Sequence, residues 1–96
     1  MRYHYLVTYD ISDPRRLRRV ARVCSDFGDR VQQSVFACQL ASKDLAILQT
    51  RLAEVMSAAE DQVIFVRLGR VHANDPGPEI DTLGRKLVLP TRCVVF

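Results

Sequence analysis

The chain has 96 residues, of which 48% are hydrophobic and 26% charged, with a formal net charge of +3 at neutral pH. This composition fits one globular domain, residues 1–96, and excludes an intrinsically disordered chain. No apolar run approaches the ~20 residues that span a bilayer, and the first residues do not resemble a signal peptide. We therefore expect a cytoplasmic protein with no membrane partner.

The cysteines and arginines give further hints about the class of protein. Cys24, Cys38 and Cys93 are far apart and form no C-x-x-C pair, so we expect buried thiols in a reducing compartment rather than a zinc site. Arginine outnumbers lysine by twelve to two. Its planar fork recognises phosphate, which hints at nucleic acid, although a biased genome composition would produce the same excess.

The first predicted element is a strand over Tyr3–Tyr9, an apolar run rich in aromatic and β-branched residues. Asp10 follows it directly, and Asp13 is a good N-cap for a helix that begins at Pro14. Side chains at the end of a strand often bind ligands or act in catalysis, because the scaffold beneath them is rigid. The alternative is that Asp10 only stabilises a turn.

A helix is predicted from about Pro14 to Phe27, with Gly28 ending it. Its apolar stripe consists of Leu17, Val20, Ala21, Cys24 and Phe27. The other side carries Arg15, Arg16, Arg18, Arg19 and Arg22. These cations crowd the helix N-terminus, where the helix dipole disfavours them, so a phosphate-binding role is favoured over a merely solvated face.

The rest of the chain alternates β-prone and helical segments. In chain order we predict a strand over Arg30–Leu40, a helix capped by Ser42 that runs to about Ala59, a strand over Gln62–Leu68, the start of a further strand at Arg70–His72, and two β-prone runs in the tail, Lys86–Leu89 and Arg92–Phe96.

The predicted order is β-α-β-β-α-β with a β-prone tail. It is the α+β, ferredoxin-like arrangement, an antiparallel sheet with both helices on one face. The middle strands are apolar on both faces, and two helices cover only one of them. Because an uncovered apolar sheet face requires a partner, we predict a homodimer that packs sheet to sheet.

A metal site is one consequence of such a dimer. Asp10 shares a strand face with His4, Leu6 and Thr8, and near a two-fold axis it would meet its own copy. Two close carboxylates must share a proton or a cation. Oxygen ligands suit Mg²⁺ or Mn²⁺, which beside a basic surface would polarise a phosphodiester and activate water. The resulting hypothesis is a metal-dependent nuclease, whereas His4 is expected to be a core or interface residue.

Three motifs at matching spacing point to a known family. They are Tyr9-Asp10-Ile11-Ser12-Asp13, Arg18-Arg19-Val20-Ala21 and Arg30-Val31-Gln32-Gln33-Ser34-Val35-Phe36, with a weaker fourth at Ile80-Asp81-Thr82-Leu83-Gly84. With these motifs the chain resembles, over nearly its whole length, the CRISPR-associated protein two family of the spacer-acquisition machinery.

The resemblance implies a homodimer of ferredoxin-like domains, with a C-terminal strand within residues 85–96 packing on the partner's sheet. It also implies a divalent metal, Mg²⁺ or Mn²⁺, shared by Asp10 of both subunits. From the resemblance and the basic helix together we predict Asp10 and Tyr9 as catalytic residues, Arg15, Arg16, Arg18, Arg19 and Arg30 as nucleic-acid contacts, and Ser34 and Phe36 as supporting residues.

Two functions are compatible with these residues. The first is a CRISPR-associated metal-dependent endonuclease that cuts single-stranded RNA or double-stranded DNA during spacer acquisition. The alternative is a non-catalytic homodimer that bridges subunits of the CRISPR integrase and holds protospacer DNA, with Asp10 structural. Both predict nucleic-acid binding that weakens steeply with salt. A sheet-face RNA-binding module is a third interpretation, but the aromatic run typical of that fold is absent.

Overall fold

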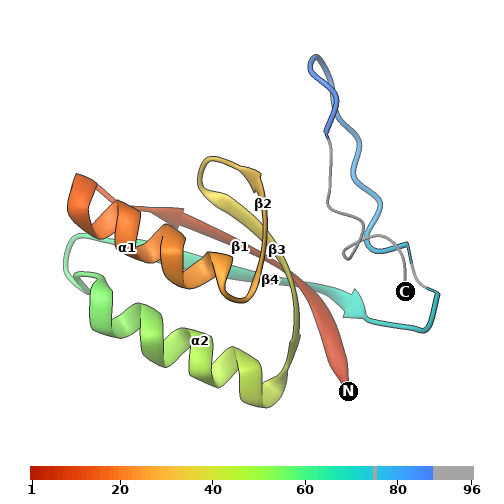
Figure 1. Ribbon diagram of the computed structural model, residues 1–96, viewed down its shortest axis with the longest axis horizontal. Helices are drawn as coiled ribbons and strands as arrows, with labels where there is room; N and C mark the ends of the chain where they lie inside the picture. The colour runs from red at the N-terminus through yellow and green to blue at the C-terminus, as the bar shows by residue number, and fades with distance from the viewer. Residues whose placement is uncertain (75, 88–96) are drawn as a thin grey trace.

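The computed structural model of the protein describes residues 1–74 and 76–87. Its elements are β1 (Arg2–Asp10), α1 (Pro14–Ser25), β2 (Gly28–Gln32), β3 (Val35–Ala41), α2 (Ser42–Val55) and β4 (Gln62–Arg70). The strands form an antiparallel sheet in the order β2-β3-β1-β4. Both helices lie on one face of this sheet (Figure 1). The predicted α+β, ferredoxin-like fold is therefore confirmed.

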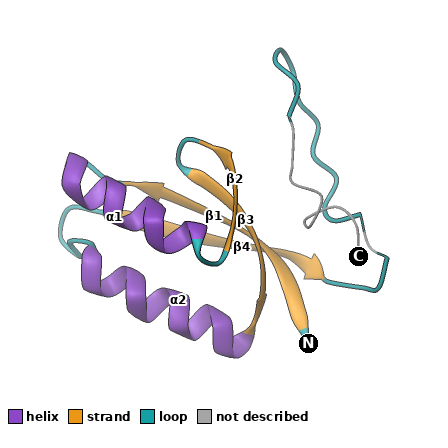
Figure 2. Cartoon of the chain, viewed as in Figure 1, coloured by secondary structure: helices purple, strands orange, loops and turns teal. Residues whose placement is uncertain are grey.

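The core lies between the layer of helices and the layer of strands (Figure 2). Because strand side chains alternate between faces, every second residue of β1 and β3 points toward the helices. The buried apolar side chains include Tyr5, Val7 and Tyr9 of β1, Phe36, Cys38 and Leu40 of β3, Val20, Val23 and Cys24 of α1, and Leu48 and Leu52 of α2. β1 pairs with β3 on one side and β4 on the other, so its C-terminal residue lies at one end of a central strand.

The predicted single strand over Arg30–Leu40 is wrong, because a turn at Gln33 and Ser34 divides it into β2 and β3. The sequence there lacks the Gly, Asn or Pro of common hairpin turns. The turn is held instead by Tyr9, whose backbone N–H donates to the Ser34 carbonyl at 3.1 Å and whose hydroxyl donates to the Gln33 carbonyl at 3.1 Å. A contact from a distant strand thus sets the hairpin.

Three predicted helix boundaries also differ from the structure. The first helix ends at Ser25 rather than at Phe27, and Gly28 begins β2 instead of ending the helix. The second helix ends at Val55, and its N-cap is Ala41, whose backbone N–H donates to the Asp44 carboxylate at 3.1 Å. An acid in the third helical position can cap a helix without a polar side chain at the cap itself.

Strand β4 is longer than the predicted Gln62–Leu68. It continues through Gly69 to Arg70, with a shift of pairing register between His4 and Tyr5 of β1. Gly69 has a φ of 149°, a value that glycine tolerates. The irregularity is accommodated inside β4, so no separate strand begins at Arg70–His72.

The face of the sheet opposite the helices is open and apolar. Ile64 and Val66 of β4 are 46% and 40% exposed, and Leu6 of β1 pairs with Val66 across this face. On the same face, His4 is buried, with 7% exposed. The open face agrees with the expectation that two helices cover only one side of the sheet, while the dimer inferred from it stays a prediction.

The cysteines that the structure describes are buried, as predicted. Cys24 and Cys38 are buried free thiols, and burial raises the pKa of Cys24 to about 11, so this thiol stays neutral and unreactive near pH 7. Cys93 and the predicted strand Arg92–Phe96 lie outside the described residues, and residues 85–87 form no regular element. Within the described ranges, no helix has the length and apolar content to cross a membrane.

Candidate metal and nucleic-acid site

Asp10 is the last residue of β1, and its side chain is exposed. It pairs with Gln62, the first residue of β4. By the alternation along β1, Asp10 lies on the open face, opposite the buried Tyr9. As predicted, Asp13 then caps α1, its carboxylate accepting from the Arg16 backbone N–H at 2.9 Å. Asp10 is therefore an exposed carboxylate at the corner where the open face meets the start of α1, whereas the Asp13 carboxylate is engaged in capping the helix.

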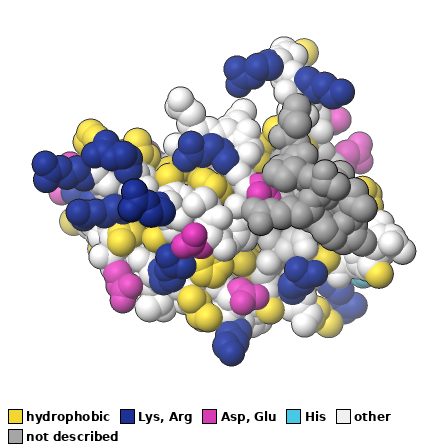
Figure 3. Space-filling model, viewed as in Figure 1, with side chains coloured by type: hydrophobic (Ala, Val, Ile, Leu, Met, Phe, Trp, Pro, Cys, Tyr) yellow, Lys and Arg dark blue, Asp and Glu magenta, His cyan; other side chains and the backbone are white. Residues whose placement is uncertain are grey.

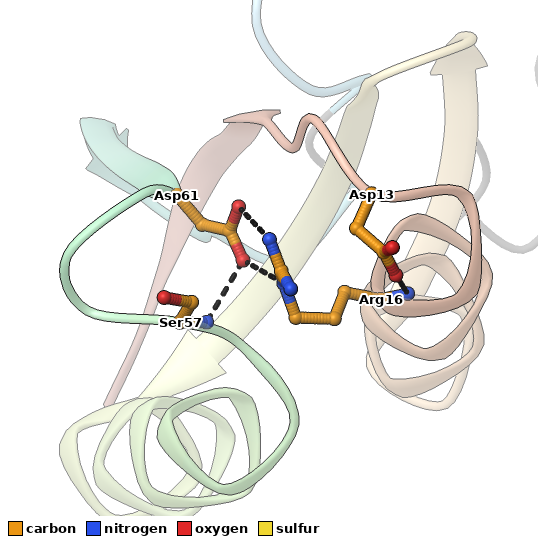
Figure 4. Close-up of polar contacts among 4 residues, drawn as sticks. All are labelled: Asp13, Arg16, Ser57 and Asp61. Carbon is orange, nitrogen blue, oxygen red and sulfur yellow. Dashed lines mark hydrogen bonds and ion pairs between the residues drawn. The ribbon is translucent and has the colours of Figure 1, made fainter.

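A partly buried ion pair stabilises this corner (Figure 4). The Arg16 guanidinium donates from Nε to Asp61 Oδ2 at 2.7 Å and from Nη2 to Oδ1 at 3.2 Å. The Asp61 side chain is fully buried, and it also accepts from the Ser57 backbone N–H at 2.8 Å. Arg16 is the largest cause, ahead of Ser57, that lowers the pKa of Asp61 from the ordinary value of 3.8. The pair fastens α1 to the segment that leads into β4.

This contact gives Arg16 a different role from that of the other arginines predicted to bind nucleic acid. Its guanidinium is already bound by a carboxylate, so positioning α1 is the role its geometry supports. The remaining arginines named here are exposed and form no ion pair within residues 1–74 and 76–87; they are Arg15, Arg18, Arg19, Arg22 and Arg30. Figure 3 shows Lys and Arg side chains gathered over α1. The basic surface expected from the sequence is present.

Tyr9, Phe36 and Arg30 form a second cluster, on the helix side of the sheet. The Tyr9 and Phe36 rings stack with centroids 6.2 Å apart, and the Arg30 guanidinium lies 5.3 Å from the centre of the Phe36 ring. Burial is the largest cause that raises the pKa of Tyr9, and Arg30 opposes this shift. The Tyr9 hydroxyl donates a hydrogen bond to a backbone carbonyl of the β2–β3 hairpin and so stabilises it. The predicted catalytic role of Tyr9 stays a prediction.

The structure thus brings together some of the predicted residues and separates others. Tyr9, Arg30 and Phe36 are in contact, and the Ser34 carbonyl is tied to the backbone of Tyr9. Asp10 lies on the other face, away from this cluster. Sequence reasoning missed the contact of Asp61 with Arg16, because an acid just before a strand resembles any solvated loop residue.

The donor set of the chain fits a divalent metal only in part. Asp10 offers the hard oxygen ligand that Mg²⁺ and Mn²⁺ prefer. Among the residues that the structure describes, no group of three or more His, Cys, Asp or Glu side chains could hold a metal ion. A metal at Asp10 would therefore need further oxygen ligands from a second subunit, from water or from a bound phosphate.

Fold and site together define a class of protein. It is a small ferredoxin-like domain with an open apolar sheet face, a carboxylate at the end of β1 and an arginine-rich first helix. The family model described as CRISPR associated protein Cas2 matches residues 1–75. The chain belongs to this family, as the resemblance predicted.

Individual relatives and a solved structure are also similar to this chain. The chain is 45% identical over 69 residues to the CRISPR-associated endoribonuclease Cas2 of Nitratidesulfovibrio vulgaris, which covers 67% of this chain and 68% of that protein. It is 34% identical over 86 residues to the CRISPR-associated endonuclease Cas2 of Halalkalibacterium halodurans, covering 84% and 85%. The solved structure of a hypothetical protein, TT1823 from Thermus thermophilus, matches with a TM-score of 0.78 and 28% identity, covering 94% of this chain and 99% of that one.

Proposed function

We propose that this protein is a metal-dependent endonuclease of CRISPR spacer acquisition, acting in the cytoplasm on phosphodiester bonds of RNA or duplex DNA. The observation that carries the proposal is the exposed Asp10 at the end of a rigid strand, next to the arginine-rich α1. Similar proteins are named as an endoribonuclease and as an endonuclease. Both activities act on the same bond, so the proposal covers both substrates.

The active form is a homodimer in which the open faces of two sheets pack together. Support comes from Ile64 and Val66, which are 46% and 40% exposed in the single chain. Burying apolar surface contributes about 25 cal/mol for each Å² removed from water. A symmetric interface on this face would also bring the two Asp10 residues toward one axis, because each lies at the end of the same face.

In such a dimer the two carboxylates would hold one Mg²⁺ or Mn²⁺, which would supply Lewis-acid polarisation of the phosphodiester and a more acidic bound water. The chain's own residues would do the remaining work. Exposed arginines of α1 would bind the phosphates on either side of the scissile bond, and Arg16 with Asp61 would keep α1 in place beside Asp10.

A non-catalytic scaffold is the second candidate. It is favoured by the donor set. Among the described carboxylates at this corner, Asp13 caps α1 and Asp61 binds Arg16, which leaves Asp10 as a ligand, and the described residues contain no larger cluster of metal ligands. In this interpretation the homodimer bridges subunits of the CRISPR integrase, and its arginines hold protospacer DNA. Asp10 would then matter for structure alone.

The substitution Asp10→Asn decides between the two, because it keeps the shape of the side chain and removes its charge. For the endonuclease we expect cleavage in Mg²⁺ to fall at least about a hundredfold, since loss of even an outer-shell partner of a metal costs ten- to a hundredfold. Nucleic-acid binding should be retained. Cleavage is measured on labelled single-stranded RNA and on duplex DNA.

Asp26→Asn is the matched control, because Asp26 is also an exposed carboxylate, 53% exposed at its side chain, and forms an exposed pair with Arg51. It should cut like the parent. If Asp10→Asn also cuts like the parent, the endonuclease proposal is wrong. If neither the parent nor the variant cuts, and both support spacer acquisition equally, the scaffold is the function.

A further inference from the structure

Gln62 is the cross-strand neighbour of Asp10. The two residues are partners in the pairing of β1 with β4, at the end of the sheet where β1 stops and β4 begins. Directly opposed residues of an antiparallel pair point to the same face of the sheet, with Cβ atoms about 4.5–5.5 Å apart. Because Asp10 lies on the open face, the side chain of Gln62 lies beside its carboxylate on that face.

Both side chains are available to a ligand. Asp10 and Gln62 are exposed, and neither side chain takes part in a hydrogen bond or an ion pair within the described parts of the chain. The described carboxylates nearby are engaged, because Asp13 caps α1 and Asp61 binds Arg16. The corner therefore presents a carboxylate and an amide side by side, both without a partner in those parts of the chain.

The backbone that presents Gln62 is fixed on both sides. Asp61, directly before it, has a fully buried side chain that is bound by the Arg16 guanidinium (Figure 4). Val63, directly after it, pairs with the buried Tyr9. Side chains on rigid elements hold a ligand more precisely than side chains on loops, so the start of β4 is a suitable place for a binding group.

An amide oxygen suits a metal that two Asp10 residues would share. Side-chain carbonyls of Asn and Gln, like carboxylates, are hard oxygen ligands for divalent cations. The amide carries no charge, so it adds a ligand without adding to the repulsion between two close carboxylates. Two Asp10 and two Gln62 side chains would offer four oxygens, and an octahedral ion would keep its remaining positions for water or a phosphate.

From these observations we infer that Gln62 is a second metal ligand of the Asp10 site, and that its side-chain carbonyl oxygen, Oε1, binds the same Mg²⁺ or Mn²⁺ as the Asp10 carboxylate. The inference rests on the proposed function, because it takes the metal shared by two Asp10 residues as given. It adds an oxygen from each chain to a site for which the carboxylate alone is a small donor set. The affinity for the metal then depends on a neutral residue of β4 as well as on the acid of β1.

The test is a titration of the full chain with Mn²⁺ in the absence of nucleic acid, with electron paramagnetic resonance measuring the free ion. Gln62→Ala removes the amide and should weaken Mn²⁺ binding about tenfold, at the low end of the losses known for partners of a metal, because water can replace the missing oxygen. Gln62→Glu keeps an oxygen at the same reach and should bind Mn²⁺ at least as tightly as the parent.

Gln49→Ala is the matched control, because it removes an amide from an exposed position on α2, and it should bind Mn²⁺ like the parent. Light scattering and thermal unfolding verify that each variant keeps the oligomeric state and stability of the parent. If Gln62→Ala alters either of them, the more conservative Gln62→Glu decides alone. In cleavage assays, the Mn²⁺ concentration for half-maximal rate should rise about tenfold in Gln62→Ala, with a smaller change at saturating Mn²⁺.

The outcomes separate this inference from the proposed function. If Asp10→Asn loses Mn²⁺ binding but Gln62→Ala binds like the parent, Gln62 is not a ligand and the proposed function is untouched. Weaker binding by Gln62→Glu than by the parent would also overturn the inference, because the amide would then act as a hydrogen-bond donor. If the parent binds no Mn²⁺, or Asp10→Asn binds it equally well, the inference and the metal-dependent function are both wrong.

Discussion

Asp61 joins two segments of the chain through one carboxylate. It binds the side chain of Arg16 in α1 and the backbone N–H of Ser57 before β4. We predict that Asp61→Asn lowers the melting temperature by several degrees, because the partly buried guanidinium of Arg16 would lose its counter-charge. Thermal unfolding followed by circular dichroism measures this change. Asp26→Asn, which breaks an exposed pair, should change the melting temperature little.

The same carboxylate gives the fold a pH dependence. Because folding lowers the pKa of Asp61 below its ordinary value of 3.8, its contribution to stability is fully present above that value. It is lost as the pH falls through the lower, native pKa. Asp61→Asn should therefore flatten the fall in melting temperature at acidic pH, and a parent whose melting temperature does not fall there would contradict this account.

At the scale of elements, the close contact of β2 with β3 depends on Gly28. A Cβ at this position would collide with the Ala37 carbonyl and the Cys38 sulfur. We predict that Gly28→Ala destabilises the fold by about 1 to 3 kcal/mol, as overpacking of a filled site does. Urea unfolding measures the change. Gln32→Ala on the same strand is exposed and should stay within about 0.5 kcal/mol.

The whole molecule carries the remaining prediction, which concerns the open face. We expect the parent to be a dimer by light scattering at micromolar concentration and Ile64→Asp to be a monomer, because a charge would be buried without a partner at the interface. Ile47→Asp is the control, since Ile47 is 42% exposed on α2 and Ile64 is 46% exposed on β4. The sheet-to-sheet dimer is wrong if the parent is a monomer, or if the two variants have the same oligomeric state.

Periodicity and capping residues in the sequence determined most of the fold. The apolar run of β1, the Asp13–Pro14 start of α1 and the apolar stripes of both helices predict two helices packed on one sheet face. These features depend on neighbouring residues in the sequence, so they can be recognised without knowledge of distant contacts. The alternation along the strand also placed Asp10 at a strand end and on the face of His4, Leu6 and Thr8, and the structure shows that this is the face without helices.

Tertiary contacts decided the rest. The hairpin at Gln33 and Ser34 depends on hydrogen bonds from Tyr9, and the division of the arginines into a paired Arg16 and unpaired neighbours depends on Asp61. In both cases the partner lies more than twenty residues away in sequence. A local sequence pattern contains no information about such a partner. When the helices pack on the sheet, polar groups become buried and need hydrogen-bond partners, and the tertiary structure decides which residues supply them.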